Sequence, residues 1–315
     1  MRSPRGTPLY AIAADVGGTS VRCGLVSAAG RLRRGSYRKT PVDSKGPADA
    51  IIKTFVAVLR DNLRQARRER LPLAGIGIGM CGPLDYENGI VLMRGLDKYD
   101  SLYGMNLKQA IRERLGLDDK EGNAFPLVFE PDSWAFARGE AWLGAGKGFR
   151  RILALTLGTG FGSAFVADGE ILGEGPGVPP PFGWIGSLPF RGGLLDDAIS
   201  RRGILTQYRA LSSAEPPAGL DVRDLAAAAR KGDAVCRQVF EGFGQMLGAA
   251  LGPIIRKFGA ECLIFGGRIS KSFDLFDESL RCGLHDTPSL RRVTVARSIN
   301  LATLWGAARL VFTKI

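Results

Sequence analysis

The apolar positions of this chain fall into short runs that end in glycine-rich turns. Residues 9–13 are mostly apolar and lead into residues 14–20, which read Ala-Asp-Val-Gly-Gly-Thr-Ser. Residues 152–157 form a second apolar run, which leads into residues 158–163, Gly-Thr-Gly-Phe-Gly-Ser. Short apolar runs bounded by glycine are typical of buried strands. The pattern therefore predicts a strand, a tight turn and a second strand in each place.

The remaining pattern alternates between the two kinds of element. It predicts helices over residues 46–70, 106–115 and 133–143, and strands over residues 73–80 and 126–130. Asn88-Gly89 marks a hairpin tip. Strands that alternate with helices indicate an α/β protein with helices layered on mixed sheets.

The first turn has the composition of a phosphate-binding site. Gly17 and Gly18 allow a close approach of backbone amides to an anion, and Thr19 adds a hydroxyl donor. Asp15 would repel a bare phosphate, so its presence indicates Mg²⁺, which carboxylates and phosphate oxygens hold together. A β-hairpin without chemistry is the alternative, and the two interpretations are compatible.

A second and a third turn extend this pattern. Residues 158–162 repeat the plan about 140 residues later, which indicates a duplicated fold with one phosphate turn in each half. Gly266 and Gly267 follow the apolar residues 263–265 where a helix could begin. Glycines in that place suit close packing against the base or sugar of a nucleotide.

Composition places the chain among ordinary globular proteins. It has 315 residues, 45% of them hydrophobic and 23% charged, which is enough for two domains with cores of their own. No stretch approaches the roughly 20 consecutive apolar residues of a membrane-spanning helix. The five cysteines are scattered, without a C-x-x-C pair. We expect a cytoplasmic protein with no membrane partner.

The formal net charge of +12 raises the question of a nucleic-acid partner. Much of the excess, however, lies on amphipathic helices such as that of residues 59–70, where arginines would line a solvated face. We therefore expect no nucleic-acid partner.

The three turns together resemble those of a known family. Asp-x-Gly-Gly-Thr at 15–19, Leu-Gly-Thr-Gly-Phe-Gly-Ser at 157–163 and Phe-Gly-Gly at 265–267 are similar to the two phosphate motifs and the adenosine motif of ROK sugar kinases. The likeness runs from residue 9 to residue 308 and is greatest to bacterial glucokinases that use ATP or inorganic polyphosphate. It implies an actin-like (ribonuclease H-like) duplicated α/β fold, with two domains around a cleft.

The resemblance also implies a domain division, cofactors and a nucleotide site. Residues 1–131 would form the N-terminal domain, with 301–315 packing back on it, and residues 132–300 the C-terminal domain. ATP and Mg²⁺ are the implied cofactors, with Asp15 holding the metal through water, and similar proteins are usually homodimers. The implied nucleotide-binding residues are Asp15, Gly17, Gly18, Thr19, Gly158, Thr159, Gly160, Gly162, Gly266 and Gly267.

Asp132 matches the catalytic aspartate of the family, within Glu130-Pro131-Asp132-Ser133. Phosphoryl transfer needs a carboxylate that accepts the proton of the attacking hydroxyl. From local sequence alone, an aspartate before a helix is more often an N-cap. The resemblance favours the general base.

The sugar side departs from the family pattern. The implied substrate-binding residues are Gly82, Glu130, Trp184, Ser187 and Asp196. Pro131 replaces a sugar-binding asparagine, Trp184 a glutamate and Ser187 a histidine, while Asp196 falls nearest to a later glutamate. Trp184 is interpreted either as a stacking platform for a sugar with fewer free hydroxyls or as part of a packed, proline-rich loop.

No zinc site is expected. The family's structural zinc needs that histidine and a cysteine cluster, but residues 188–195 contain no cysteine, and His285 is the only histidine in the sequence.

The sequence thus predicts a carbohydrate kinase that transfers the terminal phosphoryl group of ATP to a hexose or hexose derivative, at its 6-hydroxyl. The alternatives are a non-catalytic sugar or nucleotide sensor of the same fold and a polyphosphate-dependent glucokinase.

Overall fold

The computed structural model describes residues 6–117, 124–212 and 217–314. The chain divides into two compact units, one of residues 1–144 with 300–315, and the other of residues 145–299. Each is described by itself. In the part of the chain that the structure describes, none of the helices combines the length and the apolar character that crossing a bilayer requires.

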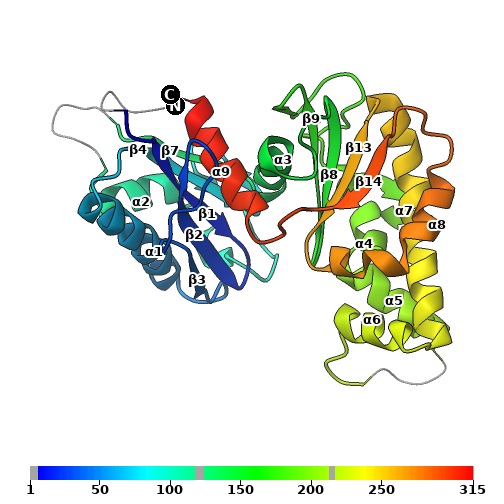
Figure 1. The fold of residues 1–315 in the computed structure, drawn as a ribbon. Coiled ribbons are helices and arrows are strands. Elements are labelled where there is room, and N and C mark those ends of the chain that lie inside the picture. The colour runs from blue at the N-terminus through cyan, green and yellow to red at the C-terminus, as the bar shows by residue number, and fades with distance from the viewer. Residues whose placement is uncertain (1–5, 118–123, 213–216, 315) are drawn as a thin grey trace. The chain divides into compact units, whose positions relative to one another are not determined.

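The first unit is built on a five-stranded sheet with strand order β3-β2-β1-β4-β7 (Figure 1). The first three strands are antiparallel, and β4 and β7 continue the sheet in parallel. The strands are β1 (Tyr10–Val16), β2 (Ser20–Ser27), β3 (Arg38–Pro41), β4 (Leu73–Met80) and β7 (Leu127–Pro131).

Both faces of this sheet are covered by helices. On β1, Ile12, Ala14 and Val16 pack toward α1 (Ala48–Arg68) and α2 (Leu107–Leu115). Ala11 and Ala13 point to the opposite face and pack on α9 (Ala302–Thr313). Because successive side chains of a strand alternate between faces, a strand buried on both sides has a nearly continuous apolar sequence.

Two glycines allow α3 (Asp132–Leu143) and α9 to approach closely. A Cβ atom on Gly139 would lie 1.9 Å from the carbonyl oxygen of Ala302, and one on Gly306 would lie 1.7 Å from that of Ala135. This packing places α3 in the first unit, whereas the sequence assigned residues from 132 onward to the second domain. The helix that begins at Asp132 is thus held by the C-terminal helix.

The second unit repeats the plan of the first. Its five-stranded sheet has the order β10-β9-β8-β13-β14, again with three antiparallel strands followed by two parallel ones. The strands are β8 (Arg151–Leu157), β9 (Phe161–Ala167), β10 (Glu170–Leu172), β13 (Cys262–Gly266) and β14 (Arg292–Val295). The two sheets have equal strand orders, which agrees with the duplicated fold that the two glycine turns predicted.

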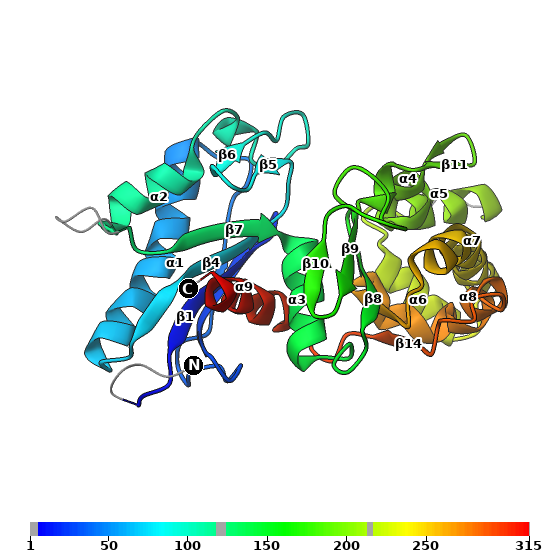
Figure 2. The same cartoon turned by 90° about the horizontal axis from the view of Figure 1, so that it is seen from above.

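A helical layer covers one face of the second sheet, as Figure 2 shows from above. Leu153 and Leu155 of β8 share a core with Phe243 and Leu247 of the long helix α7. The helices of this unit are α4 (Leu195–Ile199), α5 (Arg201–Leu211), α6 (Val222–Arg230), α7 (Ala234–Phe258) and α8 (Asp277–Gly283).

Short elements complete both units. A small hairpin follows β4, and its tip at Asn88-Gly89 agrees with the sequence. The short strands are β5 (Leu84–Asp85), β6 (Ile90–Val91), β11 (Pro189–Phe190) and β12 (Gly193–Leu194); the 3-10 helices are η1 (Asp100–Leu102), η2 (Ile185–Ser187) and η3 (Ile269–Leu275).

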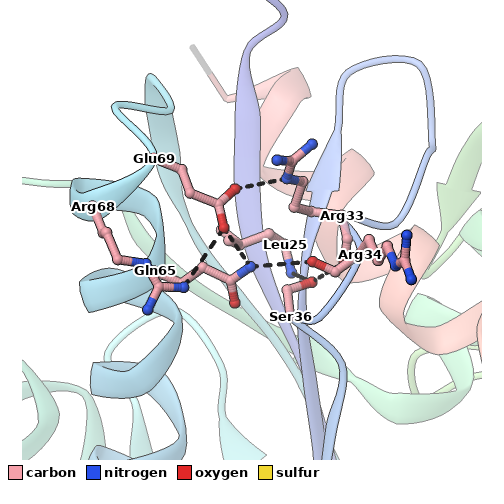
Figure 3. Close-up of polar contacts among 7 residues, drawn as sticks. All are labelled: Leu25, Arg33, Arg34, Ser36, Gln65, Arg68 and Glu69. Atoms are coloured by element: carbon pink, nitrogen blue, oxygen red, sulfur yellow. Dashed lines mark hydrogen bonds and ion pairs between the residues drawn. The ribbon is translucent and has the colours of Figure 1, made fainter.

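A polar network joins the connection between β2 and β3 to the end of α1 (Figure 3). Arg33 Nε donates to Glu69 Oε2 at 2.7 Å, and Gln65 Nε2 donates to Glu69 Oε1 at 2.9 Å and to the carbonyl oxygen of Arg34 at 3.2 Å. Ser36 fastens the same connection, since its hydroxyl accepts from the backbone amide of Leu25 at 3.0 Å. Part of the basic surface is therefore structural.

Candidate active site

The first predicted phosphate turn connects β1 to β2 and is held by hydrogen bonds of its backbone. The Gly17 amide donates to the Ser20 carbonyl at 3.1 Å, and the Gly17 carbonyl accepts from the Tyr99 hydroxyl at 2.6 Å. The Thr19 carbonyl accepts from the Val42 amide at 3.1 Å. Thr19 itself is exposed, so its hydroxyl is accessible to a ligand.

Asp15 stands at the end of β1, where it pairs directly with Arg22 across the hairpin. Arg22 Nη1 lies 2.6 Å from Asp15 Oδ2. Burial raises the pKa of the Asp15 carboxyl, and the Arg22 guanidinium opposes that shift. Arg22 belongs to no sequence motif, and only the strand register shows that it faces Asp15.

Asp132 begins α3, immediately after β7 delivers the chain to the edge of the sheet (Figure 2). Its Oδ1 accepts from the Ser133 amide at 2.8 Å. The N-cap position belongs to Pro131, so Asp132 is not the capping residue of this helix. Burial, and then the nearby charge of Asp15, raise the pKa of Asp132, while Lys98 lowers it. The structure thus brings Asp15 and Asp132 together.

Two further predicted residues, Glu130 and Gly82, belong to the same unit as Asp132. Glu130 is buried on β7, and its Oε2 lies 3.2 Å from Nε of Arg138, which is also buried. Gly82 follows β4, and a Cβ atom there would lie 2.6 Å from the Tyr86 hydroxyl. Glu130 therefore takes part in a buried ion pair.

The second unit places its two glycine turns at one edge of its sheet. Thr156 of β8 pairs with Gly266 of β13, and a Cβ atom on Gly267 would lie 2.2 Å from the carbonyl oxygen of Leu157. Gly267 has φ +81°, a conformation that favours glycine. The predicted phosphate and adenosine turns are thus adjacent at the carboxyl ends of parallel strands, where α/β proteins bind ligands.

The backbone amide and carbonyl groups of the turn at Gly158 are hydrogen-bonded. The Gly158 amide donates to the Gly160 carbonyl at 3.0 Å, and the Gly158 carbonyl accepts from the Arg201 amide at 2.9 Å. Asp196 Oδ1 accepts from the Phe161 amide at 2.6 Å. Thr159 and Gly160 are exposed, whereas Gly162 is half-buried. Asp196 therefore positions this turn.

Trp184 contacts Phe161, the first residue of β9 after the same turn. Its indole Nε1 donates to the carbonyl oxygen of Phe161 at 3.0 Å, while 43% of the residue remains exposed. Phe182 is 70% exposed, so these aromatic side chains are not filling a core. Ser187 uses its hydroxyl to donate to the Trp184 carbonyl at 3.0 Å. The hydrogen bond from Nε1 thus holds the Trp184 indole in place.

The next feature is the arrangement of side chains that could bind a metal ion. Among the described residues, no three histidine, cysteine, aspartate or glutamate side chains gather in a way that could hold a metal ion. His285 is exposed, with Nδ1 2.9 Å from the Cys282 carbonyl oxygen.

Comparison with known proteins agrees with this geometry. The ROK family matches residues 11–314. A glucokinase of Thermotoga maritima is 31% identical over 290 residues, which cover 87% of this chain and 86% of the relative. A ROK family glucokinase of Streptomyces griseus, solved in complex with glucose and AMPPNP, has a TM-score of 0.75 at 24% identity and covers 96% of this chain and 99% of that one.

The same fold also occurs in a regulator. A ROK family transcriptional regulator, a homologue of the Escherichia coli MLC protein, has a TM-score of 0.77 at 20% identity and covers 96% of this chain and 78% of that one. The repeated sheets and these structures confirm the actin-like fold. The chain belongs to the ROK family.

Proposed function

We propose that this protein is a sugar kinase that transfers the terminal phosphoryl group of ATP to the 6-hydroxyl of a hexose or hexose derivative. The observation that carries the proposal is the nearness of a half-buried carboxylate, Asp132, to Asp15, which precedes the predicted phosphate turn of the same unit. A general base beside a phosphate turn is what transfer to a hydroxyl requires. The glucokinase of Thermotoga maritima supports the sugar as acceptor.

In this proposal Asp132 accepts the proton of the attacking hydroxyl. The Gly18 amide and the Thr19 hydroxyl bind the outer phosphates, and Gly17 lets the backbone of the turn approach them closely. In the second unit, residues 158–162 bind phosphate, and Gly266 and Gly267 lie against the adenosine. Water must be kept from the phosphoryl group, which domain closure achieves in kinases.

Asp15 suits Mg²⁺ bound through water. Its carboxylate is buried at the phosphate turn, and Asp132 adds a second negative charge nearby. One or two carboxylates with phosphate oxygens form the usual protein site for this ion. Bound there, Mg²⁺ would neutralise charge on the phosphates. Arg22 would then orient the Asp15 carboxylate.

The acceptor is proposed to lie against Trp184. An indole fixed through Nε1 and 43% exposed offers an apolar surface on which a sugar can stack. Glu130 is engaged by Arg138 and Asp196 by the Phe161 amide, so fewer side chains serve sugar hydroxyls than the family pattern implies. This favours a hexose derivative with a larger apolar face over plain glucose.

A coupled assay of ADP release tests the proposal. The panel contains glucose, mannose, N-acetylglucosamine, N-acetylmannosamine and a polyol, each with Mg²⁺ and ATP. We expect turnover of at least one hexose or hexose derivative, faster than ATP hydrolysis without acceptor. A parallel series with polyphosphate, followed by sugar phosphate formation, identifies the donor. Binding of nucleotide and sugar without turnover of either donor would contradict the kinase and indicate a sensor.

The pH dependence of turnover should report the environment of Asp132. Burial and Asp15 raise its pKa above the usual 3.8, and a base acts only when deprotonated. We therefore expect kcat/KM to be constant at neutral pH and to fall as the pH drops through this raised pKa. Because Asp15 lies beside Asp132, the apparent pKa at which kcat/KM falls belongs to the pair of carboxyl groups. A profile that stays flat down to the usual aspartate pKa would contradict a raised pKa of Asp132 and its assignment as the base.

A further inference from the structure

Lys98 lies in the connection between β6 and η1, next to a residue that is anchored to the phosphate turn. Tyr99 has a left-handed backbone, with φ 59°, and is fully buried. Its hydroxyl donates to the Gly17 carbonyl at 2.6 Å, and its amide donates to the Ser44 carbonyl at 2.6 Å. The backbone of Lys98 is therefore fixed relative to the turn.

The side chain of Lys98 extends from the phosphate turn toward Asp132. Its Cδ would lie 3.8 Å from a Cβ atom on Gly18, so the aliphatic stem passes over the turn. Burial raises the pKa of the Cys81 thiol, just after β4, and the charge of the Lys98 ammonium group opposes that rise, so the two groups lie near each other. Burial and the charge of Asp15 raise the pKa of Asp132, and the charge of Lys98 opposes that rise as well, so Lys98 lies near both groups.

A cation in this place has a specific use in phosphoryl transfer. The terminal phosphoryl group carries negative charge on its equatorial oxygens throughout the reaction. Asp15 and Asp132 add negative charge on the same side, and Arg22 is engaged with Asp15. A phosphoryl group that moves from the turn toward Asp132 would therefore be repelled unless a cation lies along its path.

We propose that Lys98 is a further catalytic residue, whose ammonium group binds the terminal phosphoryl group between the turn at Gly18 and the base Asp132. The inference rests on the proposed kinase function. The hydroxyl oxygen forms a bond to phosphorus while its proton passes to Asp132. The bond between phosphorus and the bridging oxygen breaks, and ADP leaves with that electron pair. Lys98 donates hydrogen bonds throughout and changes no covalent bond.

Steady-state kinetics on the best acceptor test this role. Lys98→Met is expected to lower kcat by about 10²- to 10³-fold, as removal of a single preorganised donor does, with the KM of the sugar nearly unchanged. Lys98→Arg keeps the charge and should restore part of the loss. The control is Lys45→Met. Lys45 forms an exposed ion pair with Asp97, which precedes Lys98 in the connection between β6 and η1. The kcat of this control should change by no more than about fivefold.

Nucleotide binding separates this inference from the proposed function. By calorimetry with Mg²⁺, Lys98→Met should bind AMPPNP about tenfold or more weakly than the unchanged protein does, while ADP affinity stays the same. This comparison needs no acceptor, so it decides the role of Lys98 even if the sugar panel shows no turnover. Equal losses for both nucleotides, no loss for either, or equal kcat effects of Lys98→Met and Lys45→Met would overturn the inference.

Discussion

Replacing Asp132 with asparagine is expected to lower kcat by about 10²- to 10⁴-fold, the usual contribution of a general base. Asparagine keeps the size of the side chain and can still accept from the Ser133 amide, which Asp132 Oδ1 does at 2.8 Å. What it loses is the capacity to take the proton of the attacking hydroxyl. The affinity for ATP should remain, since the phosphate turns are untouched. Steady-state kinetics and calorimetric titration with AMPPNP measure the two quantities.

Asp233→Asn is the matched control for this variant. Asp233 also stands at the start of a helix, where its Oδ1 accepts from the Cys236 amide at 2.7 Å. Asparagine caps helices as well as aspartate does, so kcat and stability should stay close to those of the unchanged protein. If Asp132→Asn retained full turnover, the assignment of the base would be wrong, whatever the control showed.

Replacing Gly306 with alanine is expected to lower the free energy of unfolding by about 1–3 kcal/mol or more, because the added methyl group overpacks a helix crossing. A Cβ atom there would lie 1.7 Å from the Ala135 carbonyl oxygen, and backbone cannot turn aside as a flexible side chain can. Since Ala135 belongs to the first turn of the helix that carries Asp132, kcat should fall as well. Urea unfolding followed by circular dichroism measures the stability.

Gly242→Ala provides the comparison. This glycine lies within α7, and a Cβ atom there would meet the end of the Gln207 side chain, which can move away. Alanine favours a helix by about 1 kcal/mol over glycine, so this variant should be neutral or stabilised. Equal stability of the two alanine variants would show that the α3–α9 crossing tolerates a methyl group.

Local patterns predicted the elements well because their causes are local. The helix expected over residues 46–70 is Ala48–Arg68, and the strand expected over residues 73–80 is Leu73–Met80. An amphipathic period and a doubly buried apolar run are properties of neighbouring residues. The fold class followed, since the repeated glycine turns marked a duplication that the equal strand orders of the two sheets show.

The residues of the candidate site that belong to sequence motifs could be predicted. Those that only tertiary contacts bring to the site could not. Asp15 and Asp132 were found through motifs and are neighbours in space. Lys98 and Arg22 belong to no motif, and their nearness to these carboxylates follows from the β1–β2 register and from the anchoring of Tyr99 on Gly17. Contacts between residues far apart in sequence leave no local pattern.

The sequence alone determined the family and the duplicated plan, and it predicts phosphate binding at the glycine turns, because glycine, threonine and aspartate there allow backbone approach and supply charge. Only the tertiary structure decided which charges act together. It assigned the helix of Asp132 to the first unit through Gly139 and Gly306, since close packing depends on the facing helix. It also directed Asp196 to the Phe161 amide and Lys98 toward Asp132, because the environment of a charged group is set by its neighbours in space.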